Sequence, residues 1–381
     1  MNIALVVVAY NRVKSLERLL SSLKHAHYGA NNVTLIISID KSDTTAVSDY
    51  ANNFEWPHGD KIVKAWEENQ GLRKHMLSLG NYFDCFDALV VLEDDIIVSP
   101  YFYSFVNATV TKYFDNPLIA GISLYNFPVN PYSQLLFEPV VTKYDVFLMN
   151  TAQSWGQIWM KNQWKDFYAW YLENTDFKYS DRIPEPLFQW RKSWLKYHTR
   201  YCIERNKYFV YPYSAYSSNC GDAGTHAQQK NYAFQSILRM GAFKNYVLPE
   251  SEDDYICYDG FFESKQIYKA LNTSENDLLL DLNGMHKSSC GKRFWLTTSK
   301  LDFKIVKTFG LELRPIELNV TENIQGNEIF LYDTTIIITN TLKGEFSLVK
   351  YNRRVLSVIG FVKKYGIKRI FKDLLMRLAH R

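Results

Sequence analysis

The sequence predicts an α/β protein with a mixed, mostly parallel sheet that is flanked by helices. Two observations predict this class. Four short apolar runs rich in β-branched residues occur in the first hundred residues, and segments with helical spacing separate them. Runs that are apolar at every position are typical of parallel strands buried on both faces. Their alternation with helices over short connections indicates right-handed βαβ units in a doubly wound sheet.

The expected elements follow one another along the first third of the chain. Strands are predicted at 3–10, 33–40, 61–66, 87–95 and 117–126. A helix is predicted after the first strand because Leu16, Leu19, Leu20 and Leu23 recur at helical spacing. Further helices are expected over 71–83 and 99–114.

The rest of the chain is less regular. The Trp- and Tyr-rich region 154–201 predicts mixed helix and loop, and the small, polar residues of 211–226 predict a loop. Short β-type runs occur between 277 and 345. We therefore expect three parts: a large ligand-binding domain at 1–245, a C-terminal extension with short β segments at 246–349, and a tail at 350–381.

The cysteines and the N-terminus predict a cytoplasmic protein. Five cysteines are widely spaced and form no Cys-x-x-Cys pair, which argues against a disulfide framework and against a zinc cluster. The apolar run after Met1 ends at Tyr10, so it is too short to span a bilayer, and we expect neither a secretory signal nor a transmembrane segment.

The tail at 350–381 is strongly basic. It contains ten Lys or Arg and a single acid, Asp373, so with a total net charge of +4 the rest of the chain carries about −5. Apolar residues alternate with these charges, and a basic amphipathic stretch indicates binding to an anionic membrane surface. The alternative is a helix packed on the acidic body of the protein. Nothing else in the chain favours nucleic acid as a partner.

Three consecutive acids, Glu93, Asp94 and Asp95, interrupt the apolar stretch "VVLEDDIIVSP" at 90–100. An unpaired carboxylate is costly to bury, so a compensating cation is expected. Mn²⁺ and Mg²⁺ take oxygen ligands and usually keep positions for substrate phosphates. Because side chains alternate along a strand, Glu93 and Asp95 are expected on one face and Asp94 on the other. The alternative is that the acids begin a solvated loop or cap the next helix.

Polar residues also follow the other predicted strands, and ligands bind at the carboxyl ends of strands in doubly wound sheets. "VVVAYNR" at 6–12 and "ISID" at 37–40 stand at two such ends. Together with "VVLEDDIIVSPYFYSF" at 90–105, these segments resemble the GT-A fold glycosyltransferases over roughly residues 1–240. The acidic segment and the later "NCGDAGTH" at 219–226 resemble those of bacterial relatives of the N-acetylglucosaminyltransferase I-like and family 2-like enzymes.

The resemblance implies a metal-dependent glycosyltransferase that moves a hexosyl or N-acetylhexosaminyl group. The donor would be a nucleotide sugar, expected to be UDP-linked, and the acceptor a glycan or lipid-linked oligosaccharide in bacterial surface polysaccharide synthesis. A location at the inner face of the plasma membrane would suit such an acceptor. Inversion at the anomeric carbon is expected, with retention as the alternative.

The resemblance also assigns roles to single residues. Asp95 would bind Mn²⁺ or Mg²⁺, and Glu93 and Asp94 would hold sugar or ribose hydroxyls. The nucleotide would contact Tyr10, Arg12 and Asp40, with His75 as a further nucleotide-side residue. Residues Asp222 to His226 would form a loop that closes over the donor. In the alternative reading, Arg12 and His75 are ordinary helix residues, Asp40 is a helix cap and His226 is a plain loop residue.

The catalytic base is not evident from the resemblance. Inverting relatives carry an acid in a Trp-flanked segment, and the matching stretch "PEPLFQWRKSWLKYH" at 184–198 lacks an acid beside its tryptophans. Glu185 is the first candidate base, followed by Asp181 and Asp166. Trp155, Trp190 and Trp194 are expected either to form an acceptor platform or to belong to the core.

Two other classes remain open at this point. A nucleotidyltransferase usually carries a glycine-rich loop after the first strand, and "AYNRVKS" at 9–15 contains no glycine. A non-catalytic carbohydrate-binding protein on the same fold would explain the missing acid near Trp194.

Overall fold

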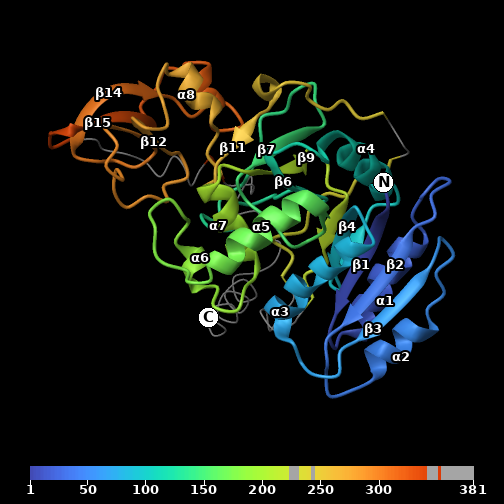
Figure 1. Cartoon of the computed structure of the whole chain (residues 1–381). Helices are drawn as coiled ribbons and strands as arrows, with labels where there is room; N and C mark the ends of the chain where they lie inside the picture. Colours follow the sequence, from blue (N-terminus) through green and yellow to red (C-terminus); the bar gives the residue numbers. More distant parts are fainter. Residues whose placement is uncertain (223–230, 242–244, 341–350, 353–381) are drawn as a thin grey trace, which may run out of the picture.

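The structure, a computed structural model, describes residues 1–222, 231–241, 245–340 and 351–352. A nine-stranded sheet forms the centre of the described structure (Figure 1). From one edge to the other its strands are β11 (Cys257–Tyr258), β7 (Val146–Met149), β9 (Tyr208–Pro212), β6 (Ile119–Ser123), β8 (Gln157–Met160), β4 (Ala88–Glu93), β1 (Ile3–Ala9), β2 (Thr34–Ile39) and β3 (Lys61–Ala65).

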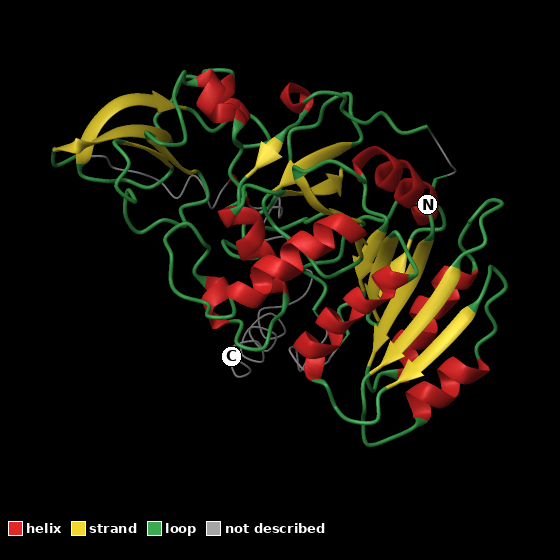
Figure 2. Ribbon diagram, viewed as in Figure 1, coloured by secondary structure: helices red, strands yellow, loops and turns green. Residues whose placement is uncertain are grey.

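The sheet is mixed and mostly parallel, which confirms the predicted fold class. Strands β4, β1, β2 and β3 run parallel to one another, as the βαβ pattern of the sequence predicts. Strand β8 is antiparallel to both of its neighbours, β4 and β6. The arrowheads of β2 and β3 in Figure 2 point to the same end of the sheet.

Helices cover both faces of the sheet. On one face lie α1 (Val13–Lys24), α2 (Ala46–Asn53) and α4 (Phe102–Tyr113). The other face carries α3 (Gly71–Ser78), the 3₁₀ helix η1 (Leu79–Asp84), α5 (Lys161–Glu173) and α7 (Leu195–Glu204), with the short α6 (Pro186–Gln189) before α7.

Strand β1 shows why the first strands read as uniformly apolar. Ile3, Leu5 and Val7 belong to the core under α1, α2 and α4. Ala4 and Val6 point to the opposite core, under α3 and α5. Both faces of the strand are therefore dry, and the alternation of side chains along it leaves no polar position.

A second sheet lies beyond the β11 edge of the large one, on the side away from β3 (Figure 1). Its strands are β12 (Leu278–Asp281), β13 (Phe294–Thr297), β15 (Ile329–Ile337) and β14 (Phe303–Phe309), in that spatial order. They share a separate apolar core with α8 (Gln266–Ala270) and α9 (Leu318–Thr321). The predicted boundaries at 245 and 349 stay predictions.

The structure differs from the sequence-based elements at two places. The region 154–201, predicted as helix and loop, also contributes β8, whose four residues are too few to show a strand period. The predicted loop 211–226 contains β10 (Ser217–Asn219), which pairs with β5 (Ile96–Val98). This short ribbon brings residue 220 to residue 95, far away in the sequence.

The remaining predictions concern the cysteines, the C-terminal tail and transmembrane segments. All five cysteines are free. The tail lies outside the described residues, apart from Tyr351 and Asn352. Across the described segments, no helix combines the length and the apolar character needed to cross a bilayer.

Candidate active site

The three acids stand where parallel neighbours end together. Glu93 is the last residue of β4 and pairs with Val8 of β1. The Asp94 N–H donates to the carbonyl oxygen of Val8 at 3.1 Å. The chain turns at Asp94 and Asp95 before β5 begins, so the strand does not continue through the triplet. The prediction that Glu93 and Asp95 share one strand face is therefore wrong.

Arg12, from the loop after β1, provides the counter-charge for this turn. Its guanidinium donates to Asp94, and its second terminal nitrogen donates to Asp95 Oδ2 at 3.1 Å. The Arg12 side chain is 25% exposed, and the Asp94 side chain is 5% exposed. Arg12 therefore supplies part of the compensating positive charge that we expect for the three acids.

Even with Arg12 present, the acids carry an electrostatic penalty. Burial raises the pKa of Asp94 to about 6, against the lowering effect of Arg12. Burial, then the charges of Asp95 and Asp94, raise the pKa of Glu93 to about 8. A hydrogen bond with Ser154 acts in the opposite direction. Raised carboxyl pKa values indicate that the site is short of positive charge.

One oxygen of Asp95 has no partner. Oδ1 of Asp95 is buried and accepts no hydrogen bond from the described residues. Buried polar atoms are nearly always paired in native structures, so an unpaired carboxylate oxygen at a strand end needs an explanation. A ligand or cation that binds there would provide the partner.

The side chains at this turn fit one form of Mn²⁺ or Mg²⁺ site and not another. Within the described segments, no group of three or more His, Cys, Asp or Glu side chains is placed to hold a metal ion. Mg²⁺-type sites often use only one or two carboxylates, with substrate phosphates and water completing the coordination. The free oxygen of Asp95 fits that form of site, and a metal cage made by protein alone does not fit.

The segment after β10 closes the outer side of the cluster. The Cys220 N–H donates to the carbonyl oxygen of Asp95 at 2.9 Å. Asp222 accepts hydrogen bonds from Ser15, at 2.8 Å, and from Arg18, both on α1. Burial acts to raise the pKa of Asp222, but these hydrogen bonds outweigh it and hold the pKa below its usual value. Asp222 is thus anchored beside the acids, and His226 lies outside the described residues.

Asp40 stands at the end of β2 and binds backbone rather than side chains. Its Oδ1 accepts from the N–H of Gln70 at 2.7 Å and of Lys41 at 2.9 Å, and its Oδ2 accepts from the N–H of Gly71 at 2.9 Å. It therefore caps α3, with an anion at the positive end of a helix. The cap that the sequence offered as the alternative reading exists, on α3 rather than on α2.

The other nucleotide-side candidates differ in exposure. Tyr10 is 38% exposed at the end of β1 and free to contact a ligand. His75 is buried on α3, where its Nε2 lies 2.7 Å from Ser38 Oγ. Burial lowers the pKa of His75 to about 4. His75 therefore belongs to the core beneath the site.

The candidate bases lie elsewhere on the surface. Glu185 is exposed before α6 and pairs with Lys287 at 2.6 Å. Asp181 and Asp166 are exposed as well. The contacts found among the described residues join none of these three acids to the triplet.

The three tryptophans separate into core and surface. Trp194 is 2% exposed and contacts Trp159 edge-on at 5.5 Å between ring centroids, so it belongs to the core. Trp155 is partly buried against Tyr125 and lies next to Ser154, the hydrogen-bond partner of Glu93. Trp190 is partly buried before α7, 6.2 Å from Tyr132.

Sequence reasoning missed two members of the site on α1. Arg12 contacts the triplet, Ser15 and Arg18 contact Asp222, and the three residues follow one another at intervals of three. Side chains at this spacing share one helix face. That periodic polar stripe, beside the leucines of the same helix, was a signal that could have found them.

Comparisons with known proteins give distant structural likenesses only. No family model matches the chain. No curated protein matches it either. Among solved structures, it is similar to S. aureus TarS 1–349 in complex with UDP, at 16% identity and a TM-score of 0.37 over 57% of this chain and 60% of that one. The same protein in complex with UDP-GlcNAc gives 13% identity and a TM-score of 0.37 over 57% and 58%.

A third similar structure is the mannosyltransferase PcManGT from Pyrobaculum calidifontis in complex with GDP-Man and Mn²⁺. It matches at 12% identity and a TM-score of 0.34 over 55% of this chain and 56% of that one. The chain thus spans less than two thirds of each of these structures. Because the TM-scores lie below 0.5, we base no step of the functional reasoning on these likenesses.

Proposed function

We propose that this chain is a metal-dependent glycosyltransferase of the GT-A type. It would transfer a hexosyl or N-acetylhexosaminyl group, with inversion, from a UDP-sugar to a glycan or lipid-linked acceptor in surface polysaccharide synthesis. The observation that carries the proposal is the unpaired, buried Oδ1 of Asp95 in an acidic turn at the carboxyl end of a parallel strand. The resemblance of the three strand-end segments to GT-A enzymes supports the same reading.

Different residues of the chain would bind different parts of the donor. Asp95 would hold Mn²⁺ or Mg²⁺ through its free oxygen, and the bound ion would neutralise the diphosphate as it leaves. Arg12 lies within 3.1 Å of Asp95 and would contact the diphosphate or the base. Tyr10, at the neighbouring strand end, would contact the nucleotide. Arg18 and Asp222 hold the outer side of the site in place.

Asp40 would recognise the nucleotide through an acceptor position that its hydrogen bonds with backbone N–H groups leave free. Asp40 accepts three N–H groups, and a carboxylate has about four lone-pair sites. One acceptor position therefore remains for a donor such as the uracil N3–H. The Asp40 side chain is fixed by these contacts, which is the preorganisation that specific base recognition needs.

Inversion also requires a base for the acceptor hydroxyl. Glu185 and Asp181 remain our candidates because both carboxylates are exposed and can therefore contact an acceptor. Neither contacts the triplet in this structure, so their role requires the acceptor to lie between them and the donor. The anomeric configuration of the product, measured by NMR, distinguishes inversion from retention.

The test is a screen of nucleotide sugars with Mn²⁺, in which hydrolysis or transfer is followed by nucleotide release. We expect activity with a UDP-sugar, and a loss of about 100-fold or more in Asp95→Ala, since an electrostatic group at the leaving group is removed. Asp115→Ala, an exposed acid after α4, is the matched control and should keep full activity. If the protein binds no nucleotide at all, the proposal is wrong.

A further inference from the structure

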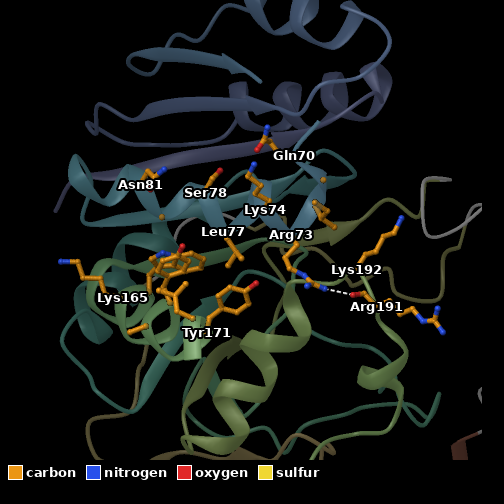
Figure 3. Close-up of a pocket in the computed structure, with 17 residues that line it drawn as sticks. Gln70, Arg73, Lys74, Leu77, Ser78, Asn81, Lys165, Tyr171, Arg191 and Lys192 are labelled. Carbon is orange, nitrogen blue, oxygen red and sulfur yellow. Dashed lines mark hydrogen bonds between the residues drawn. The ribbon is translucent and has the colours of Figure 1, made fainter. Parts of the chain in front are cut away.

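A large groove opens between α3–η1 and α5, on the sheet face away from α1. Its volume is about 970 Å³. Five basic side chains line it, and none of the described lining residues is acidic: Arg73, Lys74, Lys165, Arg191 and Lys192. In Figure 3, Lys165 lies at one end of the groove and Arg191 and Lys192 at the other, with Arg73 between them. We call this site the basic groove.

Four of these charges lack a partner in the described structure. The side chains of Lys74, Lys165, Arg191 and Lys192 are exposed and make neither a hydrogen bond nor an ion pair with any described residue. Arg73 donates to the carbonyl oxygen of Arg191 at 2.6 Å, as Figure 3 shows, and its buried Nε has no acceptor among the described residues. The basic groove thus presents positive charge that the described part of the protein does not neutralise.

A further cation behind the groove strengthens this field. Lys196 is buried, with its Nζ 4.5 Å from the centroid of the Phe177 ring. Burial, followed by the charge of Arg73, lowers the pKa of Lys196. Arg73 itself lies 5.0 Å over the ring of Tyr197. The guanidinium is therefore held in place by an aromatic ring and a carbonyl, not by a carboxylate.

The wall of the groove between the charges is apolar and aromatic. Trp164 and Tyr168 are stacked, with ring centroids 6.3 Å apart, and Tyr168 stacks on Tyr171 at 6.2 Å. Tyr168 is 39% exposed and Leu172 is 61% exposed. Aromatic surfaces of this kind accommodate the apolar C–H faces of sugar rings, and a few charged groups around them fix the orientation of the ligand.

The basic groove adjoins the candidate donor site. Gln70 and Gly71 belong to its lining, and their N–H groups donate to Asp40 at the end of β2. A single layer of hydrogen bonds thus separates the groove from the strand ends. A chain that lies in the groove would point one end toward the donor. The volume is at the upper end of ordinary ligand pockets, which suits several linked sugars better than one.

We propose that the basic groove binds the acceptor as an anionic glycan, one that carries phosphate or carboxylate groups along its chain. The acceptor role rests on the proposed transferase function, whereas the binding itself does not. The concave shape and the ring-lined wall favour a glycan over a flat membrane surface. The junction with Asp40 favours a glycan acceptor over single-stranded nucleic acid, which also combines charge with stacking.

The test titrates the full chain with matched pairs of probes, with binding followed by calorimetry. Tetragalacturonate is compared with its neutral methyl ester, and mannopentaose phosphate with mannopentaose. We expect the anionic member of at least one pair to bind about tenfold more tightly than its neutral match, and its affinity to fall with salt. The pair that responds identifies carboxylate or phosphate as the recognised group.

The variant K74S/R191S/K192S removes three exposed charges whose side chains make no contact with described residues. We expect it to bind the anionic glycan about tenfold less tightly, at a fraction of a kcal/mol per exposed charge. The control K300S/K304S/K307S removes three exposed lysines near and on β14 and should bind as the wild type does. UDP binding with Mn²⁺ is measured on all three proteins and should not change.

Three results would overturn the proposal. They are equal binding of the charged and neutral probes, an unchanged affinity in the groove variant, and groove-dependent binding of only oligothymidylate or phosphatidylglycerol vesicles. A wild type that binds anionic glycan but no nucleotide would contradict the transferase function and leave the groove assignment standing. The two failures are therefore distinguishable.

Discussion

Two oppositely charged regions lie near the strand ends of the large sheet. On one side is the acidic turn Glu93–Asp95, whose members are partly or fully buried and receive Arg12 as counter-charge. On the other side is the basic groove, whose charges, Arg73 apart, are exposed and receive none from the described residues. Asp40, at the end of β2, accepts the N–H groups of Gln70 and Gly71 from the groove, and only β1 separates β2 from β4, which ends in the acidic turn.

The acidic turn is largely buried and paired with Arg12, whereas the basic groove is largely exposed and unpaired among the described residues. We therefore expect the charges of the turn to affect folding and those of the groove to affect binding alone. A buried carboxylate must be compensated for the chain to fold, so the acidic turn is tied to Arg12, just before α1, and Asp222 beside it is tied to Arg18 on α1. An exposed lysine keeps its water and costs little when unpaired. Substitutions on the acidic side should therefore change stability together with ligand binding. Substitutions in the basic groove should change only binding.

The largest effect is expected from Arg12→Gln. It leaves Asp94 and Asp95 without their cation, and we expect unfolding to become easier by about 2 kcal/mol, less than for a fully buried pair because Arg12 is 25% exposed. Mn²⁺ should then raise the melting temperature more in the variant than in the wild type. A saturating ion at 100 times its Kd contributes about 2.7 kcal/mol.

Thermal unfolding with and without Mn²⁺ measures both effects. Arg205→Gln, at the surface after α7, serves as the control and should show neither. An Arg12→Gln protein as stable as the wild type would mean that the acids are not short of positive charge, which removes the basis of the comparison.

A smaller effect is expected from Gly221→Ala, which alters the wall of the acidic side. Gly221 has φ +67°, and a Cβ there would lie 2.1 Å from the carbonyl oxygen of Asn231. We expect a loss of about 1.5 kcal/mol in stability, within the range for a strained backbone position. UDP affinity should fall too, since the adjacent Cys220 and Asp222 contact Asp95 and α1.

Gly241→Ala is the matched control, because a Cβ at that position meets no atom within 4 Å. Denaturant unfolding gives the stability change, and calorimetry gives the UDP affinity. A Gly221→Ala protein that loses stability but keeps its full UDP affinity would show that the segment 220–222 does not belong to the donor site.

The smallest effect is expected at His198, which, like Asp95, has buried polar atoms without a partner among the described residues. Both of its ring nitrogens lack partners among the described residues, and the ring stacks on Phe167 at 4.0 Å beneath the groove-lining α5. Its whole side chain is buried, whereas that of Asp95 is 17% exposed, so no ligand can reach His198. We expect His198→Phe to stabilise the protein by about 1 kcal/mol at pH 7, since an unpaired polar group leaves the core.

His198 also predicts a pH dependence. Burial lowers the pKa of His198 to about 3, so the folded protein keeps the ring neutral while the unfolded chain protonates it below its ordinary pKa. Stability from this group is complete above pH ~6.5 and falls with pH toward 3, by about 2 kcal/mol between pH 6.5 and 5. His198→Phe should remove that part of the acid sensitivity. If its unfolding curves keep the wild-type pH slope, the ring is not buried in the neutral form.

The sequence predicted well what is encoded locally. Strands β1, β2 and β4 appeared because each is a continuous apolar run, and the acids were placed at a strand end because they follow such a run directly. The third predicted strand, β3, exists but lies at the sheet edge with none of its residues buried. Asp40 and Arg12 were found in the same way. These residues lie at the predicted edge of the sheet.

What was missed depends on contacts between distant segments. The pairing of Asp222 with α1 joins residues more than two hundred positions apart. The basic groove draws its charges from three separate segments, so no window of the sequence shows five cations and no acid. Strand β8 was missed because four residues cannot display a period, and Trp194 belongs to the core because its ring packs on Trp159 of that strand.

The most direct test of the acidic side as a metal-dependent donor site is the binding of Mn²⁺ in the presence of UDP, followed by electron paramagnetic resonance. We expect the wild type to bind Mn²⁺ only together with UDP, because Oδ1 of Asp95 is the one buried carboxylate oxygen of the acidic turn that lacks a partner among the described residues. Asp95→Asn should lose this binding, and the groove variant K74S/R191S/K192S should keep it. UDP binding of equal strength without Mn²⁺ and in Asp95→Asn would contradict the account.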